Sequence, residues 1–403
     1  MNGDGSDSRM RIGFEWMQGE GWTGGLTYLV NLLSALRDFE PESATTLVLR
    51  PASLPEPAWE QFRGLSGGAR IAAPPRRWSP VWALEHLRRL GRVPDRMWPG
   101  PIERVCLDLN LDVFFSRFVD TPTRVPRIGW IPDFQHVHLP AFFSDQDRAF
   151  RDRWFQNTAR NARIVLLSSE DALRDFRAFD PQLAAKARVL RFVAHVPDEA
   201  MKNDPSPVCR QYHLPERFLY LPNQFWVHKN HRAVFEALKR LHQRRIRPFV
   251  VCTGLLNDYR APMHFADLIQ LVSRLGVRDQ VAFLGLVPHH HVYLLMRQSV
   301  AVLNPSRFEG WNTAIEECKS LGKRAVLSDL AVHREQNPPG AVYFDPNDSE
   351  CLADCLARVW ETWQAGPDEA LETAAREALP GRRRGFAKAF LNAAREAVGR
   401  SQQ

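Results

Sequence analysis

The sequence lacks the features that identify several common classes of protein. No uninterrupted apolar run approaches the ~18 residues that a membrane-spanning helix needs. No Walker phosphate loop and no HExxH metal motif occurs. The first residues, MNGDGSDSRM, have neither the basic start nor the apolar stretch of a secretory signal, so we expect residues 1–10 to be a disordered tail.

Cysteine and excess charge are also limited. Only six cysteines occur in 403 residues, none of them as a CxxC pair, which indicates reduced thiols in a cytosolic protein. The net charge of +7 is mild for this length, and it permits phosphate, nucleic acid or acidic lipid as partners without choosing among them. With 44% hydrophobic and 25% charged residues, the composition is that of a globular protein with room for two full cores.

Strand-like and helix-like segments alternate along most of the chain. In the first half, strand patterns fall at 10–16, 45–50, 111–116, 127–132 and 163–169. The first of them leads through a glycine-containing loop into the helical pattern LTYLVNLLSALRDF. Such alternation predicts an α/β domain with a parallel sheet that helices cover on both faces.

The alternation stops at 195–217, a stretch rich in proline and in mixed charge, and then resumes. Further strand patterns lie at 218–223, 248–254, 281–286, 300–306, 324–329 and 341–345. We therefore predict an N-terminal Rossmann-like domain over 11–197, a linker over 198–217, a second Rossmann-like domain over 218–375, and a terminal helix over 376–403. A return of this helix to the N-terminal domain is one option. Two doubly wound sheets would face each other across a cleft, with ligands at the carboxyl ends of the strands.

Three carboxylates gather in RFEGWNTAIEECKSLGK, directly after a strand pattern. Thr313 and Glu316 fit an S/T-x-x-E capping box, which predicts a local role for Glu316 at the start of a helix. The backbone N–H groups of Gly310 to Thr313 would then face outward, where the partial positive charge of the helix favours a phosphate. Glu309 and Glu317 flank this anion site. Because carboxylates accept hydrogen bonds from hydroxyl groups, a sugar nucleotide fits the pattern.

EGWNTAIEE resembles the paired-glutamate motif of family 4 retaining glycosyltransferases, which have the GT-B fold. Glu309 and Glu317 stand eight positions apart, as in that motif, and NPSRF, SLGKRAVLSD and YFDPNDSECLADCL also look like the family. The resemblance is densest over 218–360 and continues in order back to residue 11. It implies that Glu309 contacts hydroxyls of the donor sugar and that Glu317 holds the ribose. Trp311 and Asn312 replace the phenylalanine and glycine common in the family, and they would shape the sugar pocket.

LPNQFWVHKNH, at 221–231, is a second candidate part of the donor site. Its strand pattern ends at Asn223, and Lys229 precedes a helix, so its ammonium group could neutralise a diphosphate without a metal. The resemblance assigns this role to Lys229. The family often has an arginine where this chain has Gln224, so full neutralisation of the diphosphate would require another basic residue.

Two further loops follow strand patterns in the first half. Gly24 and Gly25 precede a helix and would let the backbone approach the donor phosphates, as the resemblance implies, although a tight turn explains them equally well. In WIPDFQHVHLPAFF, Asp133, His136 and His138 are candidates to meet an acceptor hydroxyl. The family commonly shows a histidine immediately beside the acid, which this chain does not, and a purely structural histidine is the leading alternative.

Residues 76–104 raise the question of membrane contact. This stretch has seven arginines against three acids, 7 − 3 = +4, with interleaved tryptophans. A basic amphipathic segment can lie on an anionic membrane surface, and the alternative is a solvated face packed by its tryptophans. If anionic vesicles fail to sediment the protein at low salt, the membrane hypothesis is wrong. The histidines of PHHHVY, at 288–293, have no metal-ligand spacing, and we expect no metal site there.

These features lead to one hypothesis and several alternatives. By resemblance, the protein is a cytoplasmic GT-B glycosyltransferase that needs neither cofactor nor metal. It would move a sugar from a nucleotide diphosphate to a glycan or lipid-linked glycan in cell-surface polysaccharide synthesis, with contact to the inner membrane face left open. The alternatives are a sugar-nucleotide epimerase or hydrolase, a non-catalytic glycan-binding scaffold, and a nucleic-acid binder that charge alone permits. A glycosidase is rejected because it would leave the anion site between the two acids unexplained.

Overall fold

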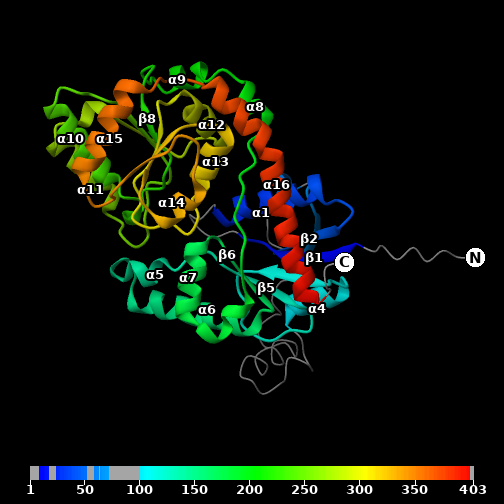
Figure 1. Cartoon of the computed structure of the whole chain (residues 1–403). Coiled ribbons are helices and arrows are strands. Elements are labelled where there is room, and N and C mark those ends of the chain that lie inside the picture. The colour runs from blue at the N-terminus through cyan, green and yellow to red at the C-terminus, as the bar shows by residue number, and fades with distance from the viewer. Residues whose placement is uncertain (1–8, 18–23, 52–58, 63, 72–99, 400–403) are drawn as a thin grey trace, which may run out of the picture. The chain divides into compact units, whose positions relative to one another are not determined.

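The computed structural model describes residues 9–17, 24–51, 59–62, 64–71 and 100–399, which form two compact units (Figure 1). Unit 1 contains residues 1–132, 149–191 and 383–403, and unit 2 contains residues 133–148 and 192–382. Most of the predicted tail, 1–8, and most of the basic segment, 76–99, lie outside the described residues.

Unit 1 is built on a seven-stranded parallel sheet in the order β3-β2-β1-β4-β5-β6-β7. Its strands are β1 Met10–Glu15, β2 Ala44–Pro51, β3 Gly67–Ile71, β4 Val113–Ser116, β5 Arg127–Ile131, β6 Ile164–Leu167 and β7 Ala187–Val189. Its main helices are α1 Gly24–Phe39, α4 Pro101–Asp108, α6 Asp145–Asn161, whose first turn is counted with unit 2, and α7 Glu170–Phe179. All five strand patterns expected in the first half are confirmed. The sequence patterns missed β3, which starts with two glycines, and β7, which has three residues.

Unit 2 is built on a six-stranded parallel sheet in the order β10-β9-β8-β11-β12-β13. Its strands are β8 Leu219–Leu221, β9 Val250–Thr253, β10 Val281–Gly285, β11 Val302–Asn304, β12 Ala325–Ser328 and β13 Val342–Phe344. Its helices are α5 Gln135–His138, α8 Asp198–Lys202, α9 Ser206–Gln211, α10 His231–Gln243, α11 His264–Arg274, α12 His289–Gln298, α13 Thr313–Leu321, α14 Ala331–Gln336, α15 Ser349–Thr362 and the N-terminal part of α16 Glu369–Val398. All six expected strand patterns of the second half are confirmed.

Alternation of side chains along the strands divides the interior of unit 2 into two layers. Leu219 and Leu221 of β8 lie in one buried cluster together with residues of α10, α11 and α15. Tyr220, between them, lies in the other cluster together with residues of α8, α9, α12 and α13. Figure 1 shows α10, α11 and α15 on one side of the sheet and α12 and α13 on the other. Successive side chains of a strand point to opposite faces, so both faces are buried and the strands are almost entirely apolar.

The strand order of each sheet reverses at one point. In unit 1 the reversal lies between β1 and β4, and in unit 2 it lies between β8 and β11. Loops that leave neighbouring strands at such a point diverge to opposite faces, and the crevice between them is where doubly wound sheets bind ligands. In unit 2 these two loops are 222–230 and 305–312, which contain Lys229 and Glu309. The fold therefore brings together two segments that lie far apart in the sequence.

The expected domain boundaries differ from the structure in several places. The predicted linker contains α8 and α9, and Met201 and Val208 pack in the core of unit 2 because these short helices are amphipathic. Residues 133–148 belong to unit 2 rather than to the first domain. The terminal helix α16 starts at Glu369 and continues through Pro380, and residues 383–403 belong to unit 1, where Phe390 stacks on Phe14 at 5.5 Å.

Two absences concern the described residues alone. None of their helices combines the length and apolarity needed to cross a membrane. None of their histidine, cysteine and acidic side chains gather in a group of three or more that could hold a metal ion. All six cysteines are free thiols, and five of them are buried.

Candidate functional site

The two loops at the strand reversal of unit 2 are tied together by Asn230. This residue ends the loop after β8 in a left-handed conformation, with φ 57°, which asparagine adopts more readily than most residues. Its buried amide donates to the carbonyl of Pro305, at 3.1 Å, and to that of Pro346, at 2.9 Å. The amide thus holds the loop after β8 against those after β11 and β13. This arrangement fixes the backbone of Lys229, which immediately precedes Asn230.

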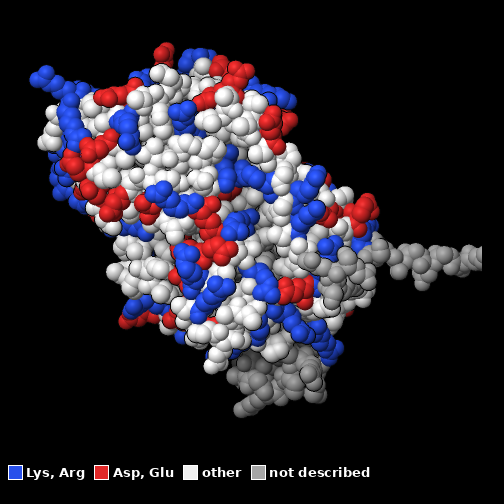
Figure 2. Space-filling view, viewed as in Figure 1, with Lys and Arg blue, Asp and Glu red and all other residues white. Residues whose placement is uncertain are grey.

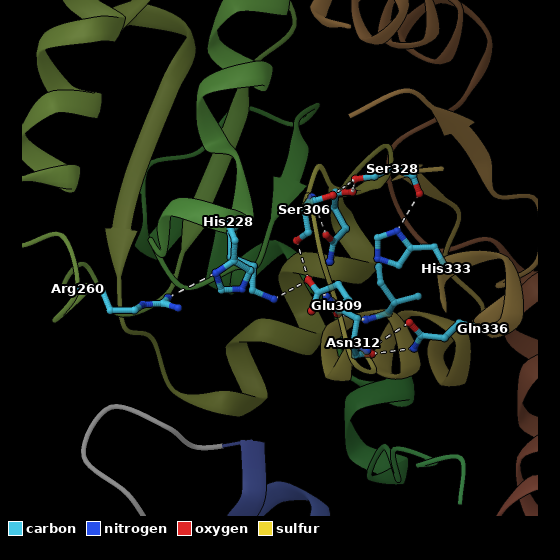
Figure 3. Close-up of polar contacts among 11 residues, drawn as sticks. His228, Arg260, Ser306, Glu309, Asn312, Ser328, His333 and Gln336 are labelled. Atoms are coloured by element: carbon cyan, nitrogen blue, oxygen red, sulfur yellow. Dashed lines mark hydrogen bonds and ion pairs between the residues drawn. The ribbon is translucent and has the colours of Figure 1, made fainter. Parts of the chain in front are cut away.

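Glu309 accepts three hydrogen bonds through a single oxygen, Oε1 (Figure 3). The donors are Nζ of Lys229 at 2.6 Å, Oγ of Ser306 at 2.6 Å and Nδ2 of Asn312 at 2.8 Å. Burial by itself would raise the pKa of Glu309, but the charge of Lys229 and these hydrogen bonds outweigh it and hold the pKa below its ordinary value. No described residue donates to Oε2, so the second oxygen of this ionised carboxylate can accept a hydrogen bond from a ligand.

The helix after Glu309 is capped differently from the predicted capping box. The cap is Asn312, whose side-chain oxygen accepts from the N–H of Ile315 at 3.0 Å, so Thr313 is the first helical residue. The side-chain amide of Asn312 also donates to Glu309. The backbone of Asn312 is held in place because Gln336 Nε2 donates to its backbone carbonyl at 2.9 Å. Asparagine is one of the strongest cap residues, which explains the shift by one position. The backbone N–H groups of Thr313 and Ala314 have no acceptor among the described residues, and they remain candidates to bind an anion.

The three carboxylates of this segment have three separate sets of partners. Glu309 pairs with Lys229, as described. Glu316 forms an ion pair with Arg382 and accepts from Gln336 at 3.3 Å, so its role is to fasten α13 to other parts of unit 2 rather than to complete a capping box. Glu317 contacts Nε2 of His289 through Oε1, at 2.7 Å. Separate partners remove the repulsion expected among three neighbouring acids.

His228 lies beside Lys229 and is the centre of a second polar group (Figure 3). Its Nδ1 is 3.5 Å from Nη2 of Arg260, and Asp258 holds Arg260 with an Nε–Oδ1 distance of 2.9 Å. Burial, together with the positive charges of Lys229 and Arg260, lowers the pKa of His228 well below its ordinary value, so the imidazole is neutral. Arg260 is therefore a basic residue close to the loop that contains Gln224, where the family resemblance leads us to expect an arginine. The carboxylate of Asp258 neutralises the charge of Arg260.

Several amide groups at the strand ends are buried without a hydrogen-bond partner. They are Nδ2 of Asn223 after β8, Nδ2 of Asn304 at the end of β11, and Oε1 of Gln224. Buried polar atoms are nearly always paired in folded proteins, so each such atom indicates a missing partner such as a ligand or an ordered water. Together with Lys229 and Glu309, these atoms place several polar groups at the carboxyl ends of β8 and β11, which are otherwise mostly apolar strands.

The structure places the other predicted site residues as follows. Gly24 and Gly25 form the first turn of α1 in unit 1. Asp133 accepts from the N–H of Gln135 at 2.9 Å, which is a local structural role, and His136 is buried, with 3% exposure. The indole N–H of Trp311 donates to the carbonyl of Phe192 at 3.1 Å. The roles of these residues toward a donor or an acceptor stay predictions.

Sequence reasoning missed three of the residues that shape this site. His289 was dismissed with its neighbours as a histidine run without metal spacing, yet it contacts Glu317. Gln336 carries no local signal at all, because it reaches Asn312 and Glu316 from α14, which lies beyond the next strand. The only signal in the sequence that could have found His228 is its position directly before Lys229.

The charged surface gives little support to nucleic acid as a partner. On the face in Figure 2, basic and acidic side chains are interspersed rather than collected in a stripe. Many exposed arginines are paired with acids, for example Arg240 with Glu350 and Arg334 with Asp329. A nucleic-acid groove needs unpaired basic residues along its path, together with stacking aromatics.

Comparison with known proteins shows a partial match to one family model and to two curated relatives. Residues 213–378 match the family described as Glycosyl transferases group 1. The chain is 26% identical over 144 residues to the O-antigen chain mannosyltransferase RfbU of Salmonella typhimurium, covering 36% of this chain and 38% of the relative. It is 25% identical over 225 residues to the alpha-D-kanosaminyltransferase of Streptomyces kanamyceticus, covering 52% of this chain and 55% of the relative. The chain thus spans between about two fifths and just over half the length of these curated relatives.

Solved structures show the fold over nearly the whole chain. Anabaena HepE, solved in complex with UDP and glucose, superimposes with a TM-score of 0.63 at 16% identity and covers 97% of this chain and 98% of its own. A glycosyltransferase from Rickettsia africae superimposes with a TM-score of 0.65 at 14% identity and covers 98% of this chain and 100% of its own. With two parallel Rossmann-like sheets and these neighbours, the chain has the GT-B fold.

Proposed function

We propose that the protein is a glycosyltransferase that uses a nucleotide-diphosphate sugar. The proposal starts from the match of residues 213–378 to the glycosyl transferases group 1 family. The single observation that carries the proposal is the pair of the largely shielded Lys229 and the buried Glu309 at the strand reversal of unit 2. A largely shielded lysine and a carboxylate with one free oxygen suit a ligand that has both a diphosphate and sugar hydroxyls. HepE, a structural neighbour with the same fold, was solved in complex with UDP and glucose.

In this proposal each group has a distinct role toward the donor. Lys229 and the N–H groups of Thr313 and Ala314 bind the diphosphate. Oε2 of Glu309 accepts a hydrogen bond from a hydroxyl of the transferred sugar, and Glu317 accepts from the ribose. Nδ2 of Asn223 and Oε1 of Gln224, which have no partner among the described residues, face groups of the same ligand. Gly24 and Gly25 approach the phosphates.

We propose that transfer retains the anomeric configuration and proceeds without a metal. The bond between C1 of the sugar and the diphosphate oxygen breaks, and its electron pair leaves with the diphosphate. The acceptor oxygen forms the new bond to C1, and its proton goes to an oxygen of the departing diphosphate. Lys229 and the helix N–H groups stabilise the charge that develops on the leaving group, which is the principal electrostatic contribution. No carboxylate acts as a nucleophile in this scheme.

The acceptor is proposed by analogy with the relatives. RfbU is described as an O-antigen chain mannosyltransferase, and the structural neighbour WaaG as a glycosyltransferase of lipopolysaccharide biosynthesis. We therefore propose that the acceptor is a hydroxyl of a glycan or of a lipid-linked glycan. We further propose that the enzyme acts in the cytoplasm, where peripheral contact with the inner membrane face would bring it to such an acceptor. Asp133 and His136 are the proposed acceptor-side residues, and His136 would require a movement of the segment around it because it is buried.

Binding of nucleoside diphosphates tests the proposal directly. Titration with UDP, GDP, ADP and CMP in the presence of EDTA should raise the melting temperature with one of the diphosphates. At ~100 times Kd the ligand should add about 2.7 kcal/mol to the free energy of unfolding. The Lys229→Ala and Glu317→Ala variants should lose most of this shift. A wild type that responds to none of the four would contradict the proposal and favour the scaffold alternative.

Product analysis separates the proposal from the remaining enzyme alternative. A sugar-nucleotide epimerase returns a nucleotide sugar with an inverted centre and needs no acceptor. A transferase consumes the donor in an acceptor-dependent way and releases the nucleoside diphosphate. Acceptor-independent isomerisation of the donor that the titration identifies would favour the epimerase.

A further inference from the structure

Three consecutive histidines open α12, and each has a different environment. His289 contacts Oε1 of Glu317 through Nε2 at 2.7 Å, and its ring lies 4.7 Å from that of Tyr293 one turn later. His290 is exposed and packs edge-on against the ring of His291. His291 Nδ1 lies 2.8 Å from the hydroxyl of Tyr212. His289 is therefore the member of the run that reaches the carboxylate at the donor site.

We propose that His289 is a positioning residue for Glu317, and that its protonation strengthens the binding of a nucleoside diphosphate. This inference rests on the proposed function, because it assumes that Glu317 accepts hydrogen bonds from the ribose. It assigns to the histidine run a role that neither metal binding nor packing of α12 supplies.

The contact with His289 leaves one oxygen of Glu317 able to accept a hydrogen bond from a ligand hydroxyl. Glu317 is buried, with 4% exposure, so its polar side chain needs a hydrogen-bond partner, which also orients it. Nε2–H of His289 donates to Oε1, and no described residue donates to Oε2. The imidazole thus fixes one oxygen and leaves the other to the ligand. His289 itself is half exposed, with 55% of its side chain accessible, so protons reach it readily.

The groups that face Glu317 leave one titration near neutral pH. Burial raises the pKa of Tyr220 on β8 and of Tyr293 on α12 far above the physiological range, and it raises the pKa of Cys318 on α13 to about 12. Burial would lower the pKa of His289, but the hydrogen bond and charge of Glu317 outweigh it and raise the pKa above its ordinary value. As the pH falls through this pKa, His289 gains a positive charge beside the site.

The sign of the effect follows from the charge of the ligand. A nucleoside diphosphate is an anion, so a protonated His289 attracts it and offsets the negative charge of Glu317. Binding should therefore be tighter below the pKa of His289 and weaker above it. By linkage, bound ligand should raise the pKa of His289 by the corresponding amount.

Three variants separate orientation from charge. His289→Gln keeps an N–H donor that can reach Glu317 but cannot be protonated, and His289→Ala removes both the donor and the charge. His290→Gln is the matched control, because the neighbouring ring does not contact Glu317. The measurement is calorimetric titration of the full-length protein at pH 6.0 and pH 8.5 with the nucleoside diphosphate that stabilises the wild type and with inorganic pyrophosphate.

We expect the affinity of the wild type for the diphosphate to rise between pH 8.5 and pH 6.0 by about fivefold more than that of His289→Gln, the low end of a typical coupling between two binding events. His290→Gln should follow the wild type. At pH 8.5, His289→Ala should bind the nucleoside diphosphate about tenfold more weakly, which corresponds to the ~1.4 kcal/mol of one lost hydrogen bond to a charged group. Its affinity for inorganic pyrophosphate, which has no ribose, should be unchanged.

Two outcomes would overturn the inference, and they differ from failure of the proposed function. If the wild type binds the nucleoside diphosphate but all three variants share its pH profile, protonation of His289 has no role. If His289→Ala weakens the binding of pyrophosphate as much as that of the nucleoside diphosphate, His289 does not act through the contact between Glu317 and the ribose. Failure of the wild type to bind any nucleoside diphosphate would instead refute the proposed function, and the inference with it.

Discussion

Replacing Lys229 by alanine, or Glu309 by glutamine, should lower the rate of sugar transfer by about 10²–10³-fold, the usual cost of removing one preorganised group that stabilises transition-state charge. Lys229 is the cation proposed to stabilise the leaving diphosphate, and Glu309 holds it by a 2.6 Å ion pair. The Glu309→Gln change keeps the shape of the side chain but removes the charge that fixes Lys229. The rate is measured as acceptor-dependent release of the nucleoside diphosphate at saturating donor.

The control must distinguish loss of chemistry from loss of folding. Glu309 is buried and Lys229 has only 12% of its side chain exposed, and removal of one partner from a buried pair typically costs about 3–5 kcal/mol of stability. Activity is therefore compared at a temperature where circular dichroism shows that each variant is folded. Lys239→Ala on α10 is the matched control, because this lysine has no ion pair among the described residues, and it should retain wild-type activity. A folded Glu309→Gln variant with wild-type kcat would refute the assigned role of the pair.

Replacing Gly322 by alanine should destabilise unit 2 by about 3 kcal/mol, the combined cost of a left-handed conformation and of overpacking. Gly322 ends α13 with φ 72°, and a Cβ atom there would lie 2.2 Å from the carbonyl oxygen of Leu371. That carbonyl belongs to the backbone of α16 and cannot rotate away. The next residue along α16, Glu372, is anchored to Arg297 at 2.7 Å, so the helix cannot easily shift either.

Gly276 provides the matched comparison. It has nearly the same conformation, with φ 68°, but a Cβ atom there would meet nothing within 4 Å. Gly276→Ala should therefore cost only about 1 kcal/mol, the backbone contribution alone. The shift of the urea midpoint measures both variants. Equal shifts for Gly276→Ala and Gly322→Ala would mean that the close approach of α16 to the end of α13 does not occur in solution.

The sequence was informative wherever a feature depends on neighbouring residues. Period-two and helical patterns are properties of short segments, and they predicted eleven of the thirteen described strands. The missed strands, β3 and β7, are held by pairing with β2 and β6 and have little apolar pattern of their own. The capping box failed for a related reason. Thr313 fits the local rule, but Asn312 is the better cap because Glu309 holds its side-chain amide and Gln336 holds its backbone.

Contacts between distant segments were decided by the tertiary structure. Lys229 and Glu309 are 80 residues apart, Glu316 and Arg382 are 66 apart, and His289 and Glu317 are 28 apart. No local pattern encodes which of two acids, one residue apart, will face a histidine and which an arginine. That choice depends on how α13 is rotated over the sheet, which the packing of Ile315, Cys318 and Leu321 in the core determines.

The sequence by itself determined the two α/β halves, the strand–loop–helix units, the presence of Lys229 and Glu309 in loops at strand or helix ends, and that of Glu317 one turn into the next helix. The reason is that periodicity and end residues are local. The tertiary structure alone decided that β8 and β11 become neighbours, that three donors converge on one oxygen of Glu309, and that His289 reaches Glu317. These are consequences of strand order and helix packing, which join segments that the chain itself keeps far apart.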